Sequence, residues 1–322
     1  MLYFLSRLIL ILLCGLPISF ANAKSATLKV VVSTAPIETL AQGILGEKGT
    51  ITQIVPANMS PHAYTLKPSD LAKMYDADVI FWIGPQMETF LVKSIDRLKN
   101  NKKIVTLIDS QGLTLFPIRT GNNWQSHDEH HHGSAKQQEP VNQSMVPSQQ
   151  MNLDPHIWLD PTNANKMLAT IATTLADLDP INHDYYVKML QEKTEELTRL
   201  DKNIGQALAP IKDKPYLVFH DGYQYLEKHY QLNDQGTVLV NPDIPLSGKQ
   251  LKEIHAKIQR LKIKCVFSEP QVNEKIAANS VKGTDAQLAI LDPLDSGLPT
   301  GWPGYTALLK KDVEVLLGCL ER

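Results

Sequence analysis

Three histidines and an aspartate stand where α/β proteins commonly place ligands. His220 and Asp292 each directly follow a short apolar run typical of a strand, and His62 lies in the loop after another such run. His156 lies in a turn bracketed by prolines, which would hold its ring in place. Ligands in open α/β sheets bind beyond the carboxyl ends of the strands, and imidazole is a common metal ligand. Taken singly, each residue is more often a hydrogen-bonded histidine or a capping aspartate, so the prediction of a metal site depends on their joint placement.

A second group of potential metal ligands lies in segment 121–150, which is rich in Gln, Ser, Asn and His and poor in large apolar residues. This composition predicts a disordered surface insertion. Imidazoles and carboxylates on such a loop can collect zinc, copper or nickel without a fixed geometry. A solvated spacer is the alternative, but the consecutive histidines favour metal. The candidate ligands are His127, Asp128, Glu129, His130, His131 and His132.

The rest of the chain repeats one pattern, a short β-branched apolar run followed by a helix-like segment. The runs lack the alternation of a half-exposed strand, so they predict strands buried on both faces of mostly parallel sheets in an α/β fold. Helices are expected at 69–77, with Ser69 as the N-cap, at 87–99 and at 248–261. The expected strands are residues 28–32, 51–55, 79–83, 104–108, 216–219, 238–240, 265–267 and 288–291.

A helical stretch separates the first four runs from the last four. Pro180 should begin a new helix, and from 181 to 208 apolar residues recur at spacings of three and four. This pattern predicts one long amphipathic helix that rigidly connects two α/β halves. The expected division is a first lobe at 24–178, the connecting helix at 179–210 and a second lobe at 211–322.

The first residues indicate a cleaved secretory signal peptide over 1–23, because a basic residue precedes an apolar run that ends in small residues. The alternative is a membrane anchor, which Pro17 and the short run disfavour. Cys14 lies within the run and does not follow a small residue, so no lipid anchor is expected. Export leaves Cys265 and Cys319, and an oxidising compartment favours a disulfide between them over two unpaired thiols.

The overall composition excludes several classes of protein. The 322 residues include 32 Lys and Arg against 34 Asp and Glu, a formal charge of −2, so the chain has no electrostatic footprint for nucleic acid. A hydrophobic content of 43% is too high for a disordered protein. A globular exported protein of two domains remains, and nothing in the sequence requires more than a monomer.

Six motifs spread over the mature chain occur in one order: Ser60-Pro61-His62, Trp82-Ile83-Gly84-Pro85 with Glu88, His156-Ile157-Trp158-Leu159, His220-Asp221-Gly222-Tyr223, Cys265-Val266-Phe267-Ser268-Glu269-Pro270-Gln271 and Leu291-Asp292-Pro293-Leu294. In these motifs the chain resembles the periplasmic metal-binding proteins that supply ABC transporters for zinc and manganese, specifically the zinc-binding ZnuA type. The resemblance covers essentially the whole mature chain. Zinc members also show an acidic, histidine-rich insertion and a late cysteine pair.

The resemblance implies two Rossmann-like α/β lobes joined by one long rigid helix, with a single Zn²⁺ carried between them in the periplasm. His62 and His156 would come from the first lobe and His220 from the second. Some zinc members have a Glu just before the first histidine, but Pro61 stands there in this chain, so the fourth ligand would be Asp292 or a water. The implied partner is an ABC permease in the membrane with its cytoplasmic ATPase.

Two alternatives compete with a zinc carrier. Three histidines with one open position also describe a catalytic zinc site, but the chain has neither the His-Glu-x-x-His motif nor the Gly-x-Ser-x-Gly motif of hydrolases. A manganese or nickel carrier, or an adhesin, could use the same scaffold. Imidazole favours zinc over manganese, which prefers carboxylate sets. We therefore expect a zinc-binding protein without enzymatic activity.

Overall fold

The computed structural model describes residues 27–119, 152–239, 247–294, 296–297 and 299–322. The predicted signal peptide and the candidate ligands of the histidine-rich insertion lie outside these ranges. Two parallel sheets and the helices around them lie within the described ranges.

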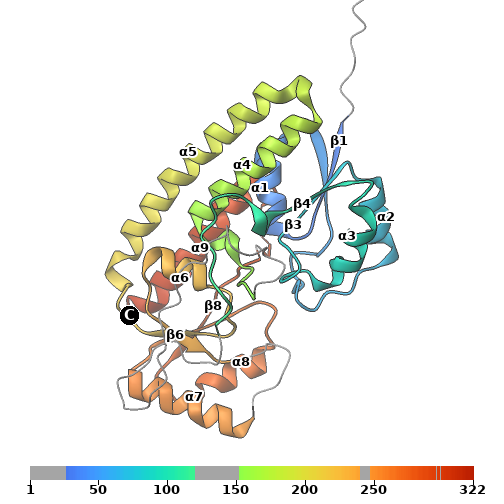
Figure 1. Ribbon diagram of the computed structural model, residues 1–322. Helices are drawn as coiled ribbons and strands as arrows, with labels where there is room; N and C mark the ends of the chain where they lie inside the picture. Colours follow the sequence, from blue (N-terminus) through green and yellow to red (C-terminus); the bar gives the residue numbers. More distant parts are fainter. Residues whose placement is uncertain (1–26, 120–151, 240–246, 295, 298) are drawn as a thin grey trace, which may run out of the picture.

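The amino-terminal half forms a parallel four-stranded sheet in the order β2-β1-β3-β4. We call this sheet and its helices the first lobe (Figure 1). The apolar runs of the sequence became its strands within two residues at each boundary. The elements are β1 (Leu28–Val32), α1 (Ala35–Leu45), β2 (Gly49–Gln53), α2 (Pro68–Asp76), β3 (Val79–Trp82), η1 (Thr89–Leu91), α3 (Val92–Leu98), β4 (Lys103–Thr106) and η2 (Leu107–Asp109).

The carboxyl-terminal half forms a second parallel sheet, in the order β6-β5-β7-β8, which repeats the topology of the first. We call this sheet and the helices around it the second lobe. It lies below the first lobe in Figure 1. The elements are β5 (Tyr216–Val218), α6 (Gln224–Tyr230), β6 (Asp234–Thr237), α7 (Gly248–Leu261), β7 (Cys265–Ser268), α8 (Glu274–Val281), β8 (Gln287–Ile290) and α9 (Trp302–Leu320).

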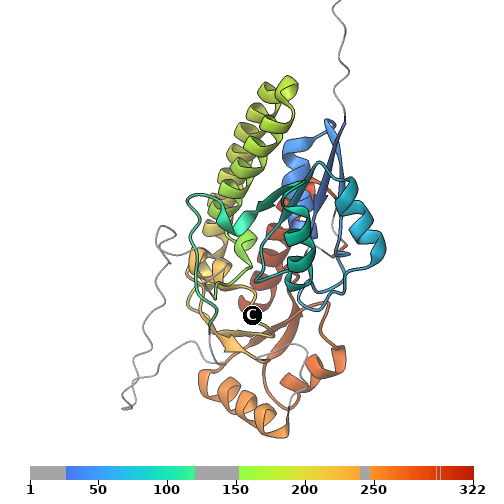
Figure 2. The same ribbon diagram turned by 45° about the vertical axis from the view of Figure 1, so that its right-hand side comes forward.

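The predicted connecting helix is present as α5 (His183–Leu208), flanked by the short turns η5 (Pro180–Asn182) and η6 (Ala209–Ile211). It packs along α4 (Pro161–Leu178), which follows the turn η4 (Ile157–Leu159), and the two form a hairpin beside both lobes (Figures 1 and 2). Pro180 starts the new helical segment, as its fixed backbone angle favours. The lobes are therefore joined along a helical hairpin.

A continuous hydrophobic core extends through both lobes. It takes one face of each sheet, for example Val30 of β1 and Val218 of β5, together with helices α1, α4, α5 and α9. Separate cores lie on the opposite faces, where Val31 packs beneath α2 and α3, and Val266 packs beneath α7 and α8. Because domains that share a large apolar interface move little against one another, this core restricts motion between the lobes more than a single connecting helix would.

The last helix strengthens this connection. Helix α9 follows the second sheet in the chain but packs against α1 of the first lobe and against α5. A disulfide joins Cys319 on α9 to Cys265 on β7, with Cα atoms 6.0 Å apart. The disulfide is thus confirmed, and it ties the second sheet to a helix that contacts the first lobe.

Two local predictions were wrong. The strand expected at 238–240 lies earlier, as β6 (Asp234–Thr237), a buried polar segment whose Asp234 pairs with Arg119. The predicted apolar residues Val238 and Leu239 follow its end, and their backbone N–H groups still donate to carbonyls of β5 and of the residue after it. Helix α2 begins at Pro68 and not after Ser69, because proline suits the first helical position. No helix in the described ranges combines the length and the apolar character that crossing a bilayer requires.

Candidate metal site

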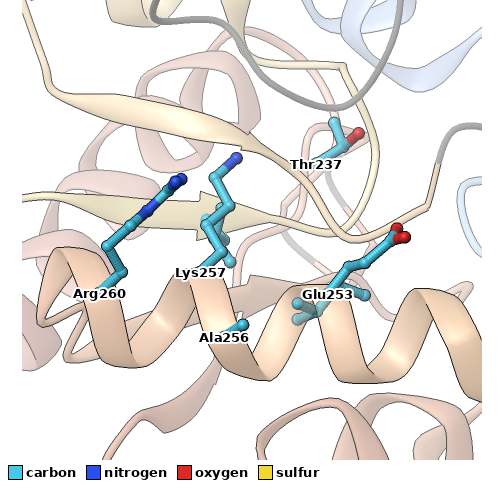
Figure 3. Close-up of a pocket in the computed structure, with 7 residues that line it drawn as sticks. Thr237, Glu253, Ala256, Lys257 and Arg260 are labelled. Carbon is cyan, nitrogen blue, oxygen red and sulfur yellow. The ribbon is translucent and has the colours of Figure 1, made fainter. Parts of the chain in front are cut away.

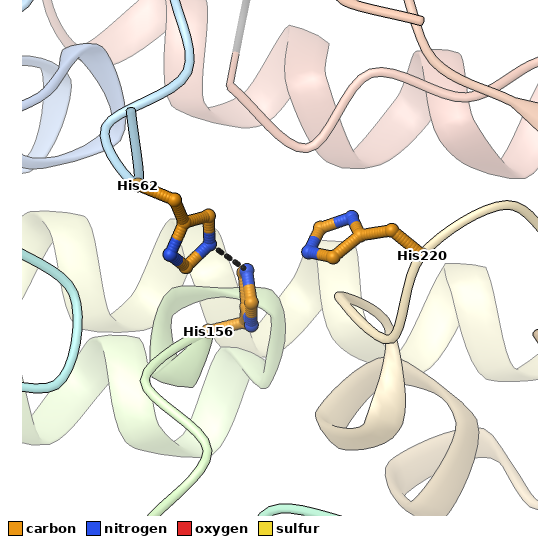
Figure 4. Close-up of side chains that lie close together, drawn as sticks. All are labelled: His62, His156 and His220. Atoms are coloured by element: carbon orange, nitrogen blue, oxygen red, sulfur yellow. Dashed lines mark hydrogen bonds between the residues drawn. The ribbon is translucent and has the colours of Figure 1, made fainter. Parts of the chain in front are cut away.

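Three histidines from distant parts of the chain converge between the lobes (Figure 4). One ring nitrogen from each of His62, His156 and His220 lies within 4.8 Å of the corresponding atoms of the other two. The Nε2 atoms of His62 and His156 are 3.3 Å apart, and the ring centroids are separated by 5.0 to 5.7 Å. Within the described part of the chain this is the group whose geometry could hold a metal ion.

Each ring lies in a loop next to a strand or a short helical turn of the fold. His62 lies between β2 and α2, and its backbone N–H donates to the Ser60 hydroxyl at 3.3 Å. His156 directly precedes the turn η4, and His220 directly follows β5. The placement of His62 and His220 after parallel strands agrees with the usual position of ligands in α/β sheets.

A buried carboxylate orients the His156 ring. Asp154 Oδ1 accepts both the backbone N–H of His156, at 3.0 Å, and a bond from its Nδ1 at 2.8 Å. With Nδ1 as the donor, the lone pair of His156 Nε2 is directed toward His62. Burial raises the pKa of Asp154 to about 6, although the backbone N–H of His156 opposes this rise. The pairing leaves the metal-facing nitrogen of His156 as an acceptor.

A second carboxylate orients His220 in the same way. His220 Nδ1 lies 2.7 Å from Glu269 Oε1, and in the described structure the buried Nε2 has no hydrogen-bond partner. Burial alone would lower the pKa of His220, but the charge and the hydrogen bond of Glu269 raise it above 6.5. A buried nitrogen without a partner is costly, and a metal ion would satisfy it.

The pKa values of the other two rings, in contrast, are lowered. Burial, together with the nearby His220, lowers the pKa of His156 to about 3. His62 is partly exposed, yet desolvation beside His156 and His220 lowers its pKa well below 6.5. Both rings are therefore neutral near pH 7, the state that metal coordination requires.

Gly222 makes room for the third ring. A Cβ atom at this position would lie 2.6 Å from Cε1 of His220, closer than real contacts allow. Any larger side chain must therefore displace the imidazole. The sequence motif contained this glycine, but only the structure shows what it accommodates.

The three rings border a cavity of about 210 Å³ that both lobes line, with side chains such as Ser60, Leu239 and Leu294 around it. A cavity needs only about 10–15 Å³ of such space to hold one water, so this one has room for a metal ion and a water ligand.

Asp292, the predicted fourth candidate, does not join the histidine group in the described structure. Its carboxylate accepts the backbone N–H groups of Leu294, at 3.1 Å, and of Ser296, at 2.7 Å. These bonds give it the role of a turn-capping aspartate. Asp221, the neighbour of His220 in the chain, pairs with Arg119.

Another cavity, of about 270 Å³, lies between α7 and the second sheet (Figure 3). Lys257 and Arg260 extend from α7 toward the strands there, and Thr237 and Glu253 also line the space. Burial lowers the pKa of Lys257 to about 8, so the amine is still largely protonated at neutral pH. Two cationic side chains repel a metal ion, and this cavity is a poor cation site.

The sequence predicted the three histidines, but it did not assign Asp154 to His156. An aspartate two residues before a histidine can form a local turn that accepts the histidine backbone N–H, so this signal was present in the sequence. It also missed Arg119, whose carboxylate partners Asp221, Glu227 and Asp234 lie more than 100 residues away.

Comparison with known proteins agrees with this fold. A crystal structure of ZnuA superposes with a TM-score of 0.72 at 26% identity, covering 90% of this chain and 99% of that one. A zinc-bound deletion mutant of ZnuA superposes with a TM-score of 0.70 at 27% identity, covering 92% of this chain and 98% of that one.

A relative known from its sequence is more similar to this chain than these two solved structures are. The high-affinity zinc uptake system protein ZnuA of Brucella suis biovar 1 is 36% identical over 309 residues, covering 91% of this chain and 92% of the relative. The profile of the family described as zinc-uptake complex component A, periplasmic, matches residues 30–319. The chain therefore belongs to the ZnuA family of periplasmic zinc-uptake components.

Proposed function

We propose that this chain captures Zn²⁺ between its two lobes and delivers it to an ABC permease for zinc uptake. The observation that carries the proposal is the convergence of three imidazoles from two lobes on one cavity. Family membership supports the same function, since the family consists of transport components and not of enzymes. The alternative of an exported hydrolase is thereby excluded.

The geometry of the first-lobe pair fits zinc. Two ligands at about 2.0–2.1 Å from a tetrahedral zinc lie roughly 3.3–3.4 Å from each other. The Nε2 atoms of His62 and His156 are already 3.3 Å apart. The largest separation allowed in the group is 4.8 Å, so His220 completes the site by a shift of at most about 1.5 Å.

The ligand set also favours zinc over manganese. Neutral imidazoles suit zinc, whereas manganese prefers carboxylates, and the carboxylates nearest the rings are occupied behind His156 and His220. We propose a water as the fourth ligand. Asp292 would have to give up two backbone hydrogen bonds to take this position.

Release follows from the division of the ligands. His220 comes from the second lobe, so a small separation of the lobes would leave zinc with only two protein ligands. The shared core and the hairpin of α4 and α5 limit the size of this motion. We propose that the permease, working with its cytoplasmic ATPase, induces this small separation when it binds.

The cellular setting completes the proposal. We propose that residues 1–23 are a cleaved signal peptide, that the mature protein is a periplasmic monomer, and that the insertion at 121–150 collects zinc weakly. We also propose the division into lobes at 24–178 and 211–322 joined by 179–210. Helix α9 belongs to the second lobe but also packs on α1 and α5. Unfolding of the second lobe is therefore expected to disrupt part of the interface between the lobes.

The proposal is tested by competition titration of the metal-free mature protein with zinc and a chelator. Three forms are compared: wild type, His220→Ala and a variant in which a short Gly-Ser linker replaces 121–150. The linker is feasible because Ile118 N–H donates to the carbonyl of Asn152 at 2.9 Å, so the described residues on either side of the segment lie next to each other.

One tight zinc site should persist after deletion of the insertion and should be lost in His220→Ala. Removal of one of three protein ligands is expected to weaken binding by about 100-fold or more, since outer-shell substitutions alone cost 10- to 100-fold. Tight binding that disappears with the insertion and ignores His220 would refute the proposal.

A further inference from the structure

Arg119 is a buried cation that connects the two segments bearing metal ligands. It ends a stem, residues 115–119, that pairs with the stem leading to His156. In this pairing Pro117 bridges Leu153, and Asp154 N–H donates to the carbonyl of Phe116 at 2.9 Å. Its side chain is only 7% exposed.

The guanidinium reaches from this stem to the second lobe. Its Nε donates to both carboxylate oxygens of Asp221, at 3.0 and 3.1 Å, and Nη2 also contacts Asp221. Nη1 donates to Glu227 of α6, and Nη2 lies 3.5 Å from a carboxylate oxygen of Asp234 in β6. Asp221 directly follows His220, so the guanidinium fork holds the turn that presents the third ring.

The same stem is linked to the ligand of the first lobe. The Tyr225 hydroxyl of α6 donates to the carbonyl of Asp154 at 2.8 Å and accepts the N–H of Phe116 at 3.2 Å. Asp154 in turn orients His156. One buried polar network therefore reaches both His156 and the turn of His220.

The charges in this network depend on the arginine. Three carboxylates surround one guanidinium, and Asp234 is fully buried. Lysine could supply the charge but not the planar fork that binds two oxygens of Asp221 and a second carboxylate together. The geometry, and not only the charge, requires arginine.

We propose that Arg119 is a positioning residue for zinc binding: by holding Asp221 against the stem of His156, it keeps the His220 ring within coordination distance of the first-lobe ligands. The inference rests on the proposed zinc function. It assigns the network a role in affinity that goes beyond packing of the lobes.

The test measures zinc affinity by chelator competition and thermal stability of the metal-free protein in five variants. Arg119→Met removes the charge and the fork, Arg119→Lys keeps the charge, and Asp221→Asn weakens the link to the His220 turn. Glu227→Gln weakens the contact between the same guanidinium and α6, away from the turn that carries His220. Arg97→Met, at an exposed position on α3, is the matched control.

Arg119→Met and Asp221→Asn should each weaken zinc binding by about tenfold or more, the range seen when groups behind metal ligands are removed. Arg119→Lys should bind zinc more tightly than Arg119→Met but more weakly than wild type. Glu227→Gln should lower the melting temperature yet leave affinity within about twofold, and Arg97→Met should change neither.

Two results would overturn the inference: unchanged affinity in Arg119→Lys, Arg119→Met and Asp221→Asn, or affinity losses that simply follow the melting temperature in all variants, Glu227→Gln included. If Arg119→Met does not fold, Arg119→Lys and Asp221→Asn decide the matter. Absence of tight zinc binding in wild type would refute the proposed function as well, whereas tight wild-type binding with unaffected variants refutes only the role of Arg119.

Discussion

The two lobes share one strand order but supply the metal site differently. The first lobe, with the stem that follows it, contributes two rings, His62 and His156, whose pKa values are lowered by burial and by neighbouring rings. The second contributes only His220, whose pKa is raised by Glu269. The first pair is already spaced for zinc, while the single ring of the second lobe brings its ligand atom within 4.8 Å of that pair.

We infer that this difference separates capture from release. In the proposed mechanism the first-lobe pair is the neutral, preorganised half of the site, and His220 is the half that is withdrawn. The second lobe is also the one that carries the disulfide and the ion pairs of Arg119. We infer that the repeated strand order gives both lobes similar frameworks for their ligands. The side chains next to each ring then determine the different roles of the histidines.

The largest expected effect concerns the disulfide, which among the described residues is found only in the second lobe. The double variant Cys265→Ala/Cys319→Ala should lose up to about 4 kcal/mol of unfolding free energy, because the bond closes a loop of 54 positions. Urea unfolding of both proteins measures this loss. Equal stability would show that the disulfide contributes nothing to the second lobe.

The next effect concerns Gly222, which makes room for His220. Gly222→Ala should weaken zinc binding by about 10- to 100-fold, because its Cβ would displace the ring. Gly205→Ala on α5 is the control, since no atom lies closer than 3.9 Å to a Cβ there. Equal zinc affinities for the two variants in chelator competition would contradict the asymmetric dependence of the site on the His220 turn.

A smaller effect concerns His229, which joins the second lobe to the helical hairpin. Its ring lies 3.1 Å from Asp160, at the start of α4, and 2.8 Å from Asp201 of α5. Burial alone would lower the pKa of His229, but these two carboxylates raise it to about 9. The protonated ring is therefore expected to stabilise the joined lobes.

Because the folded-state pKa lies above the unfolded value of about 6.5, this contribution is complete below pH 6.5 and is lost as the pH rises through about 9. His229→Gln should cost about 2 kcal/mol at pH 6, less than the full pKa shift implies because the ring is partly exposed. Its cost should be much smaller at pH 10. Urea unfolding at both pH values would contradict the account if the cost were the same.

The smallest effect, counted per unit of pH, is the pH dependence of zinc affinity. In the metal-free site, His220 is the ring whose pKa is raised, so zinc must displace about one proton as the pH falls below 6.5. Affinity should then fall about tenfold per pH unit. Titrations between pH 5 and 7 test this slope. A slope of two or more protons would mean that His62 and His156 are also charged, contrary to the neutral first-lobe pair.

Much of the fold could be predicted from the sequence. Seven of the eight apolar runs overlap strands of the structure, because residues buried on both faces of a parallel sheet form continuous apolar segments. The exception is the run at 238–240, which follows the polar strand β6, where a distant arginine compensates the buried Asp234. A charge pair over more than 100 residues leaves no local periodicity to detect.

The ligand residues of the site could be predicted from the sequence, but the contacts that hold them in place could not. His62, His156 and His220 could be named because ligands follow strands and because the motifs resemble a known family. The space that Gly222 leaves for a ring and the link between Arg119 and Asp221 depend on how the lobes pack. Such packing is determined by the shared core, and the pattern of any one segment does not contain it.

The most direct test of the central claim is the crystal structure of the zinc-loaded mature protein, with the metal located by anomalous scattering. The account predicts one strong peak about 2.0–2.1 Å from the Nε2 atoms of His62, His156 and His220. Nδ1 of His156 and of His220 should remain bonded to Asp154 and Glu269. A principal zinc peak that excludes His220, or that lies away from the space between the lobes, would contradict the account.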